Sequence, residues 1–394
     1  MISRNLRHLR VFLAVAEEAS ITGAAARFKV SQPAVTQMLG KLETQAGGAL
    51  FDRTSRGLVL TERGAVLAAR LGRVFAQLDA ALAAISTRLP EVATSGQLQA
   101  LFAVHDTGSF TRAARALGLA QPTVHRAVSQ LEQEVGAQLF ERTSHGLSPS
   151  RACSALVPRA RLALSEIDQA DMELGELDGT ETGRIVIGTL PLSRSVLLPR
   201  ALAAFRQARP KMLISVVDGA HDMLLAALRQ GDVDIMLGAL RSQSPAPDVV
   251  QEPLFQDRFA VVARPGHELV GEGPLCAEQL GRYPWIVPGP GTQLRYQFEA
   301  LFQRQGLPLP DSIIEAGFIL LIREYLDLSE SLAFTSGRQA APELDRGNLV
   351  QLPLAETLPF RDIGLTLRED WLPTRAQRLM LDCLRGAAEA LPDV

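Results

Sequence analysis

The chain has 394 residues, of which 47% are hydrophobic and 21% charged, so it is long enough for two or more globular domains. Its formal net charge of −3 excludes a uniformly basic protein that coats nucleic acid. Its three cysteines are too few and too far apart for a disulfide framework or a zinc site. Since neither a signal peptide nor a membrane-spanning stretch is recognisable, we expect a cytoplasmic protein without a cofactor or a bound metal.

One segment of the N-terminal part occurs twice. Residues 9–61 align without a gap on residues 98–150, and roughly 20 of about 53 aligned positions are identical. The shared residues cluster around a pair of alanines, around Gln-Pro, around Leu-Glu, and in Leu-Phe-x-Arg-Thr-Ser-x-Gly-Leu. Residues 1–60 also carry 8 basic and 4 acidic groups, a local excess that favours a negatively charged partner.

Each copy is predicted to form three short helices followed by a hairpin. In the first copy, Leu9, Phe12 and their neighbours recur at helical spacing. Ser20 and Ser31 can cap the second and third helices, and Pro33 lies in the first turn of the third, where a missing N–H is harmless. Two helices joined by a short turn form a helix-turn-helix, whose second helix enters the major groove of DNA.

The side chains predicted to contact DNA are those at the start of the third helix and in the hairpin, here called the wing. Gln can form a bidentate hydrogen bond with adenine, hydroxyls reach phosphates, and Lys or Arg binds phosphate or guanine. In the first copy these residues are Ser31, Gln32, Pro33, Thr36, Gln37 and Lys41, with Arg53 and Arg56 in the wing. In the second copy they are Gln121, Pro122, Thr123, His125, Arg126 and Gln130, with Arg142 in the wing.

Each copy departs from an ideal pattern at one position. In the second copy Ala120 replaces the capping serine, a change that costs about 1 kcal/mol of helix stability. In the first copy Gly40 lies inside the third helix and costs about 1 kcal/mol relative to alanine. The residues therefore leave open which copy reads the DNA sequence.

The ordered motif resembles the N-terminal domain of LysR-type transcriptional regulators, whose signature runs through the alanine pair, Ser-Gln-Pro, Leu-Glu and Leu-Phe-x-Arg. The resemblance implies that at least one copy binds double-stranded promoter DNA, and it predicts two winged helix-turn-helix domains, at 1–60 and 95–151. Here these two ranges are called the first head and the second head.

A long helical stretch is predicted after each head, at 61–94 together with its hinge and at 152–183 together with its hinge. The first carries apolar residues at alternating steps of four and three, which predicts pairing with a like helix. We expect that partner to come from a second subunit, with packing on its own domain as the alternative. Pro158 is expected to start or kink the second helix. In the resembled family this helix forms the dimer. The seam residues are Leu67, Leu71, Val74, Leu78, Ala81 and Ile85.

From residue 184 onwards, strands and helices alternate, which predicts a parallel sheet covered by helices. We expect an effector domain at 184–394 with two lobes, the first at about 184–258 and 362–394 and the second at about 259–361. This arrangement resembles the effector domain of LysR-type regulators, which is similar to periplasmic solute-binding proteins. Within the family, the galactose-binding-protein regulator subgroup is most similar. The motifs are Gly188-Thr189-Leu190-Pro191-Leu192, Leu198-Pro199, Gly231-x-x-Asp234-x-x-x-Gly238 and Arg264-Pro265-Gly266-His267.

Ligands of such sheets bind where strands end and helices begin, because free N–H groups there attract carboxylates and hydroxyls. Hydroxyls and backbone amides predominate at these positions, which suits a small polar metabolite such as a sugar or a small carboxylate. The alternative for each serine or threonine is a plain helix cap. The predicted ligand-binding residues are Leu190, Pro191, Leu192, Ser193, Arg194, Gly219, Gly291, Thr292, Thr335 and Ser336.

The sequence contains none of the common catalytic motifs for hydrolysis, phosphate binding or zinc-dependent proteolysis. We therefore expect that the protein is not an enzyme. The expected function is that of a ligand-responsive transcriptional regulator that forms a homodimer or homotetramer and acts on RNA polymerase. The alternative is a cytosolic small-molecule-binding protein whose helix-turn-helix units mediate protein contacts alone.

Overall fold

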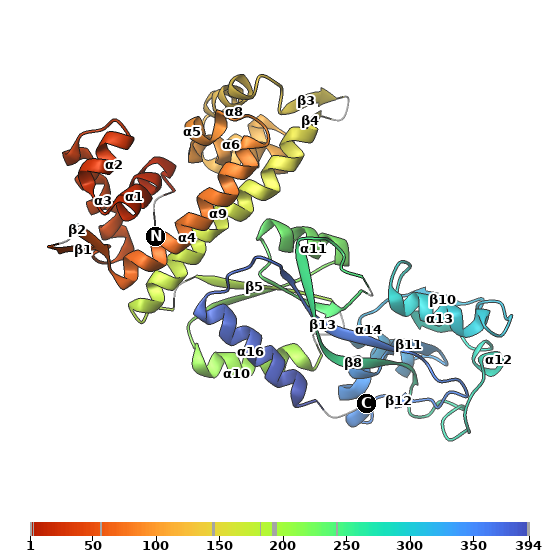
Figure 1. Ribbon diagram of the computed structural model, residues 1–394. Coiled ribbons are helices and arrows are strands. Elements are labelled where there is room, and N and C mark those ends of the chain that lie inside the picture. Colours follow the sequence, from red (N-terminus) through yellow and green to blue (C-terminus); the bar gives the residue numbers. More distant parts are fainter. Residues whose placement is uncertain are drawn as a thin grey trace. The chain divides into compact units, whose positions relative to one another are not determined.

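The computed structural model describes the chain except for residues 1, 3, 56, 144–145, 182, 191–194, 242 and 392–394. The chain divides into two compact units, shown in Figure 1. The N-terminal unit comprises Met1–Arg184 with Arg229–Gly231, and the C-terminal unit comprises Ile185–Leu228 with Asp232–Val394.

Both heads fold as three helices and a two-stranded antiparallel wing. The first head contains α1 (Leu6–Glu18), α2 (Ile21–Arg27), α3 (Gln32–Ala46), β1 (Phe51–Thr54) and β2 (Gly57–Leu60). The second head repeats this order with α6 (Ser95–Thr107), α7 (Phe110–Leu117), α8 (Gln121–Val135), β3 (Phe140–Thr143) and β4 (Gly146–Pro149). The predicted winged helix-turn-helix architecture is confirmed.

The repeated Leu-Glu motif has the same structural role in both heads. The carboxylate of Glu43 accepts a hydrogen bond from the backbone N–H of Leu50 at 3.0 Å, and Glu132 accepts one from Leu139 at 2.8 Å. Each glutamate therefore connects the third helix to the start of the wing. This shared contact gives a structural reason for the same residue pair at equivalent positions.

The helix caps follow the sequence as predicted. The hydroxyls of Ser20 and Ser31 accept hydrogen bonds from backbone N–H groups at the starts of α2 and α3. At the equivalent place in the second head, Ala120 precedes α8 and provides no side-chain cap among the described residues. One orphan N–H of α8 consequently has no partner of this kind.

Two long helices follow the heads, namely α4 (Glu62–Ala83) after the first and α9 (Arg151–Leu177) after the second, with the short α5 (Leu89–Val92) after α4. α4 and α9 lie side by side, as Figure 1 shows. They run antiparallel, since Arg63 at the start of α4 contacts Asp178 directly after the end of α9. α9 begins at Arg151, so Pro158 lies inside the helix and does not start it.

The apolar seam of α4 is covered by α9 of the same chain. Most of the predicted seam is fully or almost fully buried, and so is the equivalent face of α9. The expectation that the partner helix comes from a second subunit therefore differs from the structure, because the repeat supplies a like helix within the chain. The buried seam residues of α4 are Leu67, Leu71, Val74, Leu78 and Ala81, and those of α9 are Leu156, Ala160, Ala163, Ile167 and Ala170.

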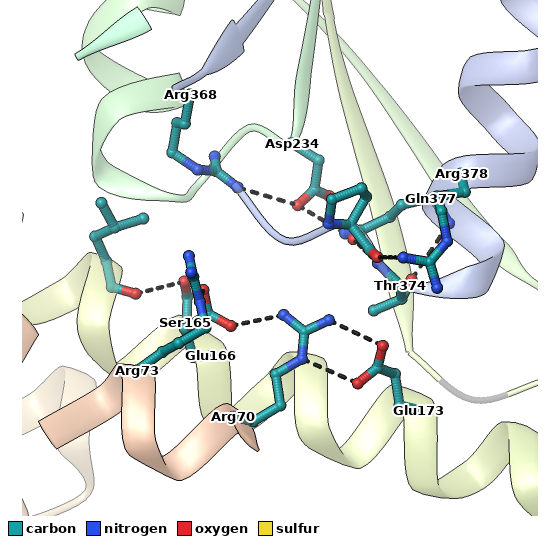
Figure 2. A network of polar contacts seen from close by, with 12 residues as sticks. Arg70, Arg73, Ser165, Glu166, Glu173, Asp234, Arg368, Thr374, Gln377 and Arg378 are labelled. Atoms are coloured by element: carbon teal, nitrogen blue, oxygen red, sulfur yellow. Dashed lines mark hydrogen bonds and ion pairs between the residues drawn. The ribbon is translucent and has the colours of Figure 1, made fainter. Parts of the chain in front are cut away.

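A buried ion cluster joins the same two helices, as Figure 2 shows. The Arg70 side chain on α4 is 1% exposed and donates hydrogen bonds to Glu166 at 2.6 Å and to Glu173 at 3.0 Å, both on α9. Arg73 donates a further bond to Glu166 at 3.1 Å. Burial alone would lower the pKa of the Arg70 guanidinium, but the hydrogen bonds with both glutamates outweigh it and raise the pKa. Arg70 therefore stays charged.

The C-terminal unit is built on one mixed sheet in the order β10-β9-β11-β8-β13-β7-β5-β6, with β12 also paired to β8. The strands are β5 (Arg184–Thr189), β6 (Leu213–Asp218), β7 (Ile235–Ala239), β8 (Val249–Ala263), β9 (Trp285–Val287), β10 (Ile313–Glu315), β11 (Leu332–Ser336), β12 (Val350–Gln351) and β13 (Phe360–Arg368). The helices are α10 (Leu197–Ala208), α11 (His221–Gln230), α12 (Ala277–Leu280), α13 (Gln293–Gln303), α14 (Ile319–Asp327), α15 (Gly337–Asp345) and α16 (Arg375–Glu389).

Two strands, β8 and β13, pass from one lobe of this sheet to the other. They pair antiparallel along their length, and Asp257 lies opposite Arg361. β8 pairs with β11 in the second lobe, and β13 pairs with β7 in the first. Separate apolar clusters cover the two faces of the sheet in each lobe. The predicted two-lobed α/β fold is confirmed.

Candidate DNA-binding and effector sites

In the first head, the polar residues at the start of α3 face solvent while the apolar residues face the core. Gln32, Thr36, Gln37 and Lys41 are exposed, and so are Ser31 and Pro33, as the sequence predicts for a recognition helix. Val35, Leu39 and Leu42 are buried against α1 and α2. The helix therefore presents a row of amides, a hydroxyl and an ammonium to a partner.

Two of these side chains already have partners in the head. Gln32 donates from its side-chain amide to the hydroxyl of Thr22 on α2 at 3.0 Å, and the Thr36 hydroxyl donates to the backbone carbonyl of Gln32. Lys41 lies near His8, and burial, followed by the charges of Lys41 and Arg7, lowers the pKa of the His8 imidazole. Lys41 and Arg7 therefore place positive charge near His8.

In the second head, the corresponding residues of α8 are also exposed, but their chemistry is different. His125 lies against the Phe110 ring, with 5.0 Å between the ring centroids, whereas Arg126 is exposed. Gln130 accepts a hydrogen bond from Gln97 at 3.2 Å. The remaining predicted residues, Gln121, Pro122 and Thr123, are exposed at the start of the helix.

The wings carry one described arginine each. Arg53 lies on β1 and Arg142 occupies the equivalent place on β3, and both are exposed. Arg56 lies outside the described residues. In both wings the threonine that follows the arginine donates its hydroxyl across the turn, from Thr54 to Gly57 and from Thr143 to Gly146, each at 3.0 Å. The wings are therefore held by the same contact.

Four of the described effector residues lie between the end of a strand and the start of the next helix, whereas Thr335 and Ser336 lie at the end of β11. Leu190 follows β5 and donates its backbone N–H to the Leu237 carbonyl at 3.0 Å. Gly219 precedes α11, and Gly291 precedes Thr292, which caps α13 by accepting from the Arg295 N–H at 3.2 Å. Pro191, Leu192, Ser193 and Arg194 lie outside the described residues.

The end of β11 is connected to the strands that cross between the lobes. Ser336 is fully buried, caps α15, and donates its hydroxyl to the Asp257 carboxylate at 2.9 Å. Asp257 also accepts two hydrogen bonds from Arg361, at 2.9 and 2.7 Å. Burial lowers the pKa of the Arg361 guanidinium, and its contact with Asp257 opposes that shift. Thr335 is buried beside Ser336, in β11.

Sequence reasoning missed Asp257 and Arg361. Both belong to pairs of adjacent charged residues next to apolar runs, Asp257-Arg258 before residues 259–263 and Arg361-Asp362 before residues 363–365, and these pairs were the available signal. The next residue of β13, Asp362, accepts a backbone hydrogen bond from Leu240 of the first lobe at 2.9 Å. The buried pair thus lies where the two lobes meet.

In the described ranges, no group of three His, Cys, Asp or Glu side chains is arranged to hold a metal ion. None of the helices described here combines the length and the apolar character that crossing a membrane requires.

A helix-turn-helix with a wing, joined to a two-lobed α/β domain, defines a class of ligand-responsive DNA-binding regulators. The lysR-family model for bacterial regulatory helix-turn-helix proteins matches residues 6–65 and again residues 95–154, and the LysR substrate binding domain matches residues 178–389. The chain belongs to the LysR family of transcriptional regulators and is not an enzyme. This membership favours DNA binding over helix-turn-helix units that contact proteins alone.

Curated relatives include transcriptional regulators from several bacteria. The transcriptional regulator GalR of Pseudomonas putida is 35% identical over 384 residues, which cover 97% of this chain and 96% of that protein. GbpR of Azospirillum brasilense is 27% identical over 293 residues, which cover 74% of this chain and 86% of that protein.

Two solved structures share the fold. A full-length OxyR variant from Pseudomonas aeruginosa is 21% identical with a TM-score of 0.54, and its match covers 74% of this chain and 95% of that one. CbnR complexed with its target DNA is 17% identical with a TM-score of 0.52, and its match covers 74% and 98%. Each match covers nearly all of the solved structure but only 74% of this chain, so this chain contains a segment that both structures lack.

Proposed function

We propose that both heads of this regulator contact promoter DNA, through the starts of α3 and α8 and through the two wings. The observation that carries this proposal is that every described polar side chain predicted for these sites is exposed on both heads, while the interleaved apolar residues are buried. The amides and the basic groups on these faces are donors suited to base edges and phosphates.

An electrophoretic mobility-shift titration tests this proposal, with the DNA upstream of the protein's own gene and at several salt concentrations. We expect affinity to fall steeply with salt, because Lys and Arg release counterions when they bind phosphates. Replacing Gln37 and Lys41 with alanine should weaken binding by about tenfold or more. Replacing Arg282, which is exposed in the C-terminal unit, is the matched control and should leave binding unchanged.

We further propose that a small polar metabolite, a sugar or a small carboxylate, binds where the strands of the effector domain end. Leu190 to Arg194, Gly219, Gly291, Thr292, Thr335 and Ser336 are the proposed contacts. The positions of Leu190, Gly219 and Gly291 support this assignment, because each lies between the end of a strand and the start of the next helix. A ligand that prefers one lobe arrangement would shift the population of that arrangement.

Thermal-shift screening of sugars and small carboxylates would identify candidate effectors. Alanine at Ser193, Thr292 and Ser336 should then abolish the shift, whereas alanine at Ser244, a serine of the first lobe that bonds its own loop, should not. Unaltered responses in all three variants would refute the assignment.

We also propose that the regulator works in the cytoplasm as a homodimer or homotetramer and acts on RNA polymerase.

A further inference from the structure

The pairing of α4 with α9 is symmetric with respect to the sequence repeat. The buried residues of α9 are those that correspond to the seam of α4, for example Leu156 to Leu67 and Ile167 to Leu78. Two equivalent helices that run antiparallel and bury equivalent faces are related by a local twofold axis. The first head precedes α4 and the second precedes α9, so the heads lie at opposite ends of the pair, as Figure 1 shows.

The charges of the cluster favour this pairing over a pair of α4 helices from two chains. The residues that correspond to Glu166 and Glu173 are Gln77 in α4 and Ala84, which directly follows α4. In an α4–α4 pair, Arg70 would therefore face an amide and a methyl group instead of two carboxylates. Pairing with α9 gives Arg70 two carboxylate partners that a second α4 lacks, so α9 is the better partner.

Further contacts hold the first head on α9. The backbone N–H of Ile2 donates to the Asp171 carboxylate at 2.6 Å, and the Arg4 guanidinium donates to Asp168 at 2.6 Å. Ile2 is itself buried. The first head is therefore bound both to the helix that follows it and to the helix that follows the second head.

The length of this helix pair suits successive turns of DNA. α4 has 22 residues, which at 1.5 Å per residue span about 33 Å. Two half-sites one turn apart on B-DNA are separated by about 34 Å. The recognition helices at the two ends differ, because Gln37 and Lys41 in α3 correspond to Arg126 and Gln130 in α8.

From these observations we infer that one chain is a complete two-headed DNA reader, whose target is an inverted pair of unlike half-sites about one helical turn apart. The inference rests on the proposed DNA contacts of both heads and adds the geometry and asymmetry of the target. A symmetric dimer would require equal half-sites, because its two recognition helices are identical.

A cross-linking experiment tests the pairing within one chain independently of DNA. Cysteines replace Arg63 and Asp178 in the full chain, in which Cys276 and Cys383 are changed to serine, and a short bismaleimide is added. We expect a product of single-chain mass in which both introduced thiols are consumed by one linker. A product of double mass would overturn the inference, because α4 would then pair with α9 of another chain. Two singly modified thiols would also overturn it.

Selection from a pool of DNA duplexes with a randomised centre tests the target. The unmodified protein should enrich two unlike motifs in inverted orientation. Gln32→Ala with Gln37→Ala should abolish enrichment of one motif, and Gln121→Ala with Arg126→Ala should abolish that of the other. Arg282→Ala is the control and should retain both. Two identical motifs, or a single motif, would overturn the inference.

Failure of the proposed DNA binding has a different signature. If the unmodified protein enriched no motif at any salt concentration, DNA binding by the heads would be wrong, even if the cross-link formed within one chain. If motifs were enriched but both changed together in either head variant, DNA binding would stand and the two-headed reader would be wrong.

Discussion

Arg70 on α4 donates one hydrogen bond to each carboxylate oxygen of Glu173 on α9, at 3.0 Å in both cases. With Glu166 on its other side, the guanidinium is enclosed by two carboxylates in a buried position. Removing one member of such a cluster leaves buried charge without a partner, which costs more than the cluster contributes.

Arg70→Met should therefore destabilise the N-terminal unit by about 3 kcal/mol. Both tryptophans, Trp285 and Trp371, lie in the C-terminal unit, so their fluorescence reports on that unit alone. In urea unfolding, the part of the helical circular-dichroism change that comes from the N-terminal unit should move to lower urea, while the fluorescence transition stays in place. The matched control is Arg159→Met at the equivalent, exposed position of α9, which should change stability by less than about 0.5 kcal/mol.

Restoring the missing cap should stabilise the second head. Ala120→Ser supplies a hydroxyl for the orphan N–H groups of α8 and should add about 1 kcal/mol. Ser31→Ala in the first head removes the equivalent hydrogen bond and should subtract a similar amount. Hydrogen exchange of the amides at the starts of α3 and α8 measures both changes, and protection that moves the same way in both variants would contradict the prediction.

Gly40 within α3 and Gly47 directly after it should respond to replacement by alanine with opposite changes in stability. Gly40 lies inside the helix, and a Cβ there would meet no described atom within 4 Å, so Gly40→Ala should stabilise by about 1 kcal/mol. Gly47 ends the helix with a φ of 79°, a left-handed conformation in which alanine is strained. Gly47→Ala should therefore lower the urea midpoint and Gly40→Ala should raise it, both measured without DNA.

The thiol of Cys153 should be inert in the folded protein. Burial, followed by the charge of Glu132, raises its pKa to about 12. Because the thiolate is the reactive form, only about one thiol in ten thousand is ionised at pH 8. Iodoacetamide should label Cys153 after unfolding in urea and not before, as measured by mass spectrometry of peptides. Rapid labelling in the native state would show that α9 opens locally.

Asp257→Ala should destabilise the C-terminal unit by about 3 to 5 kcal/mol, because it leaves Arg361 buried without its counterion. The fluorescence transition should move to lower urea in this variant. Ser336→Ala removes one hydrogen bond and leaves the ion pair intact, so its effect should be about 1 kcal/mol. Equal shifts in the two variants would argue against the ion pair as the main contact.

Much of the N-terminal fold could be predicted from the sequence, because it depends on local rules. Ser20 and Ser31 cap helices, and the seam of α4 repeats at heptad spacing, so short stretches of sequence specify both features. The partner of that seam was not predictable in the same way. Periodicity shows that a helix has an apolar face, but the distant charges of Glu166 and Glu173 decide what covers it.

The candidate sites show the same difference between features that local sequence specifies and contacts between distant residues. Exposed Gln and Arg at the start of a recognition helix follow from the phase of the helix, so their position on the surface was predictable. The link from Ser336 to Asp257 and Arg361 joins three strands that are far apart in the sequence. Register between such strands is set by the folded sheet, and no local pattern around Ser336 indicates it.

The alanine before α8 has a consequence for how this regulator can change over generations. In a dimer of identical chains, loss of a capping hydroxyl weakens both reading helices at once. Here the missing hydroxyl at Ala120 affects α8 alone and leaves the Ser31 cap of α3 in place. A mutation can therefore change the stability of one head while the other head is unaffected.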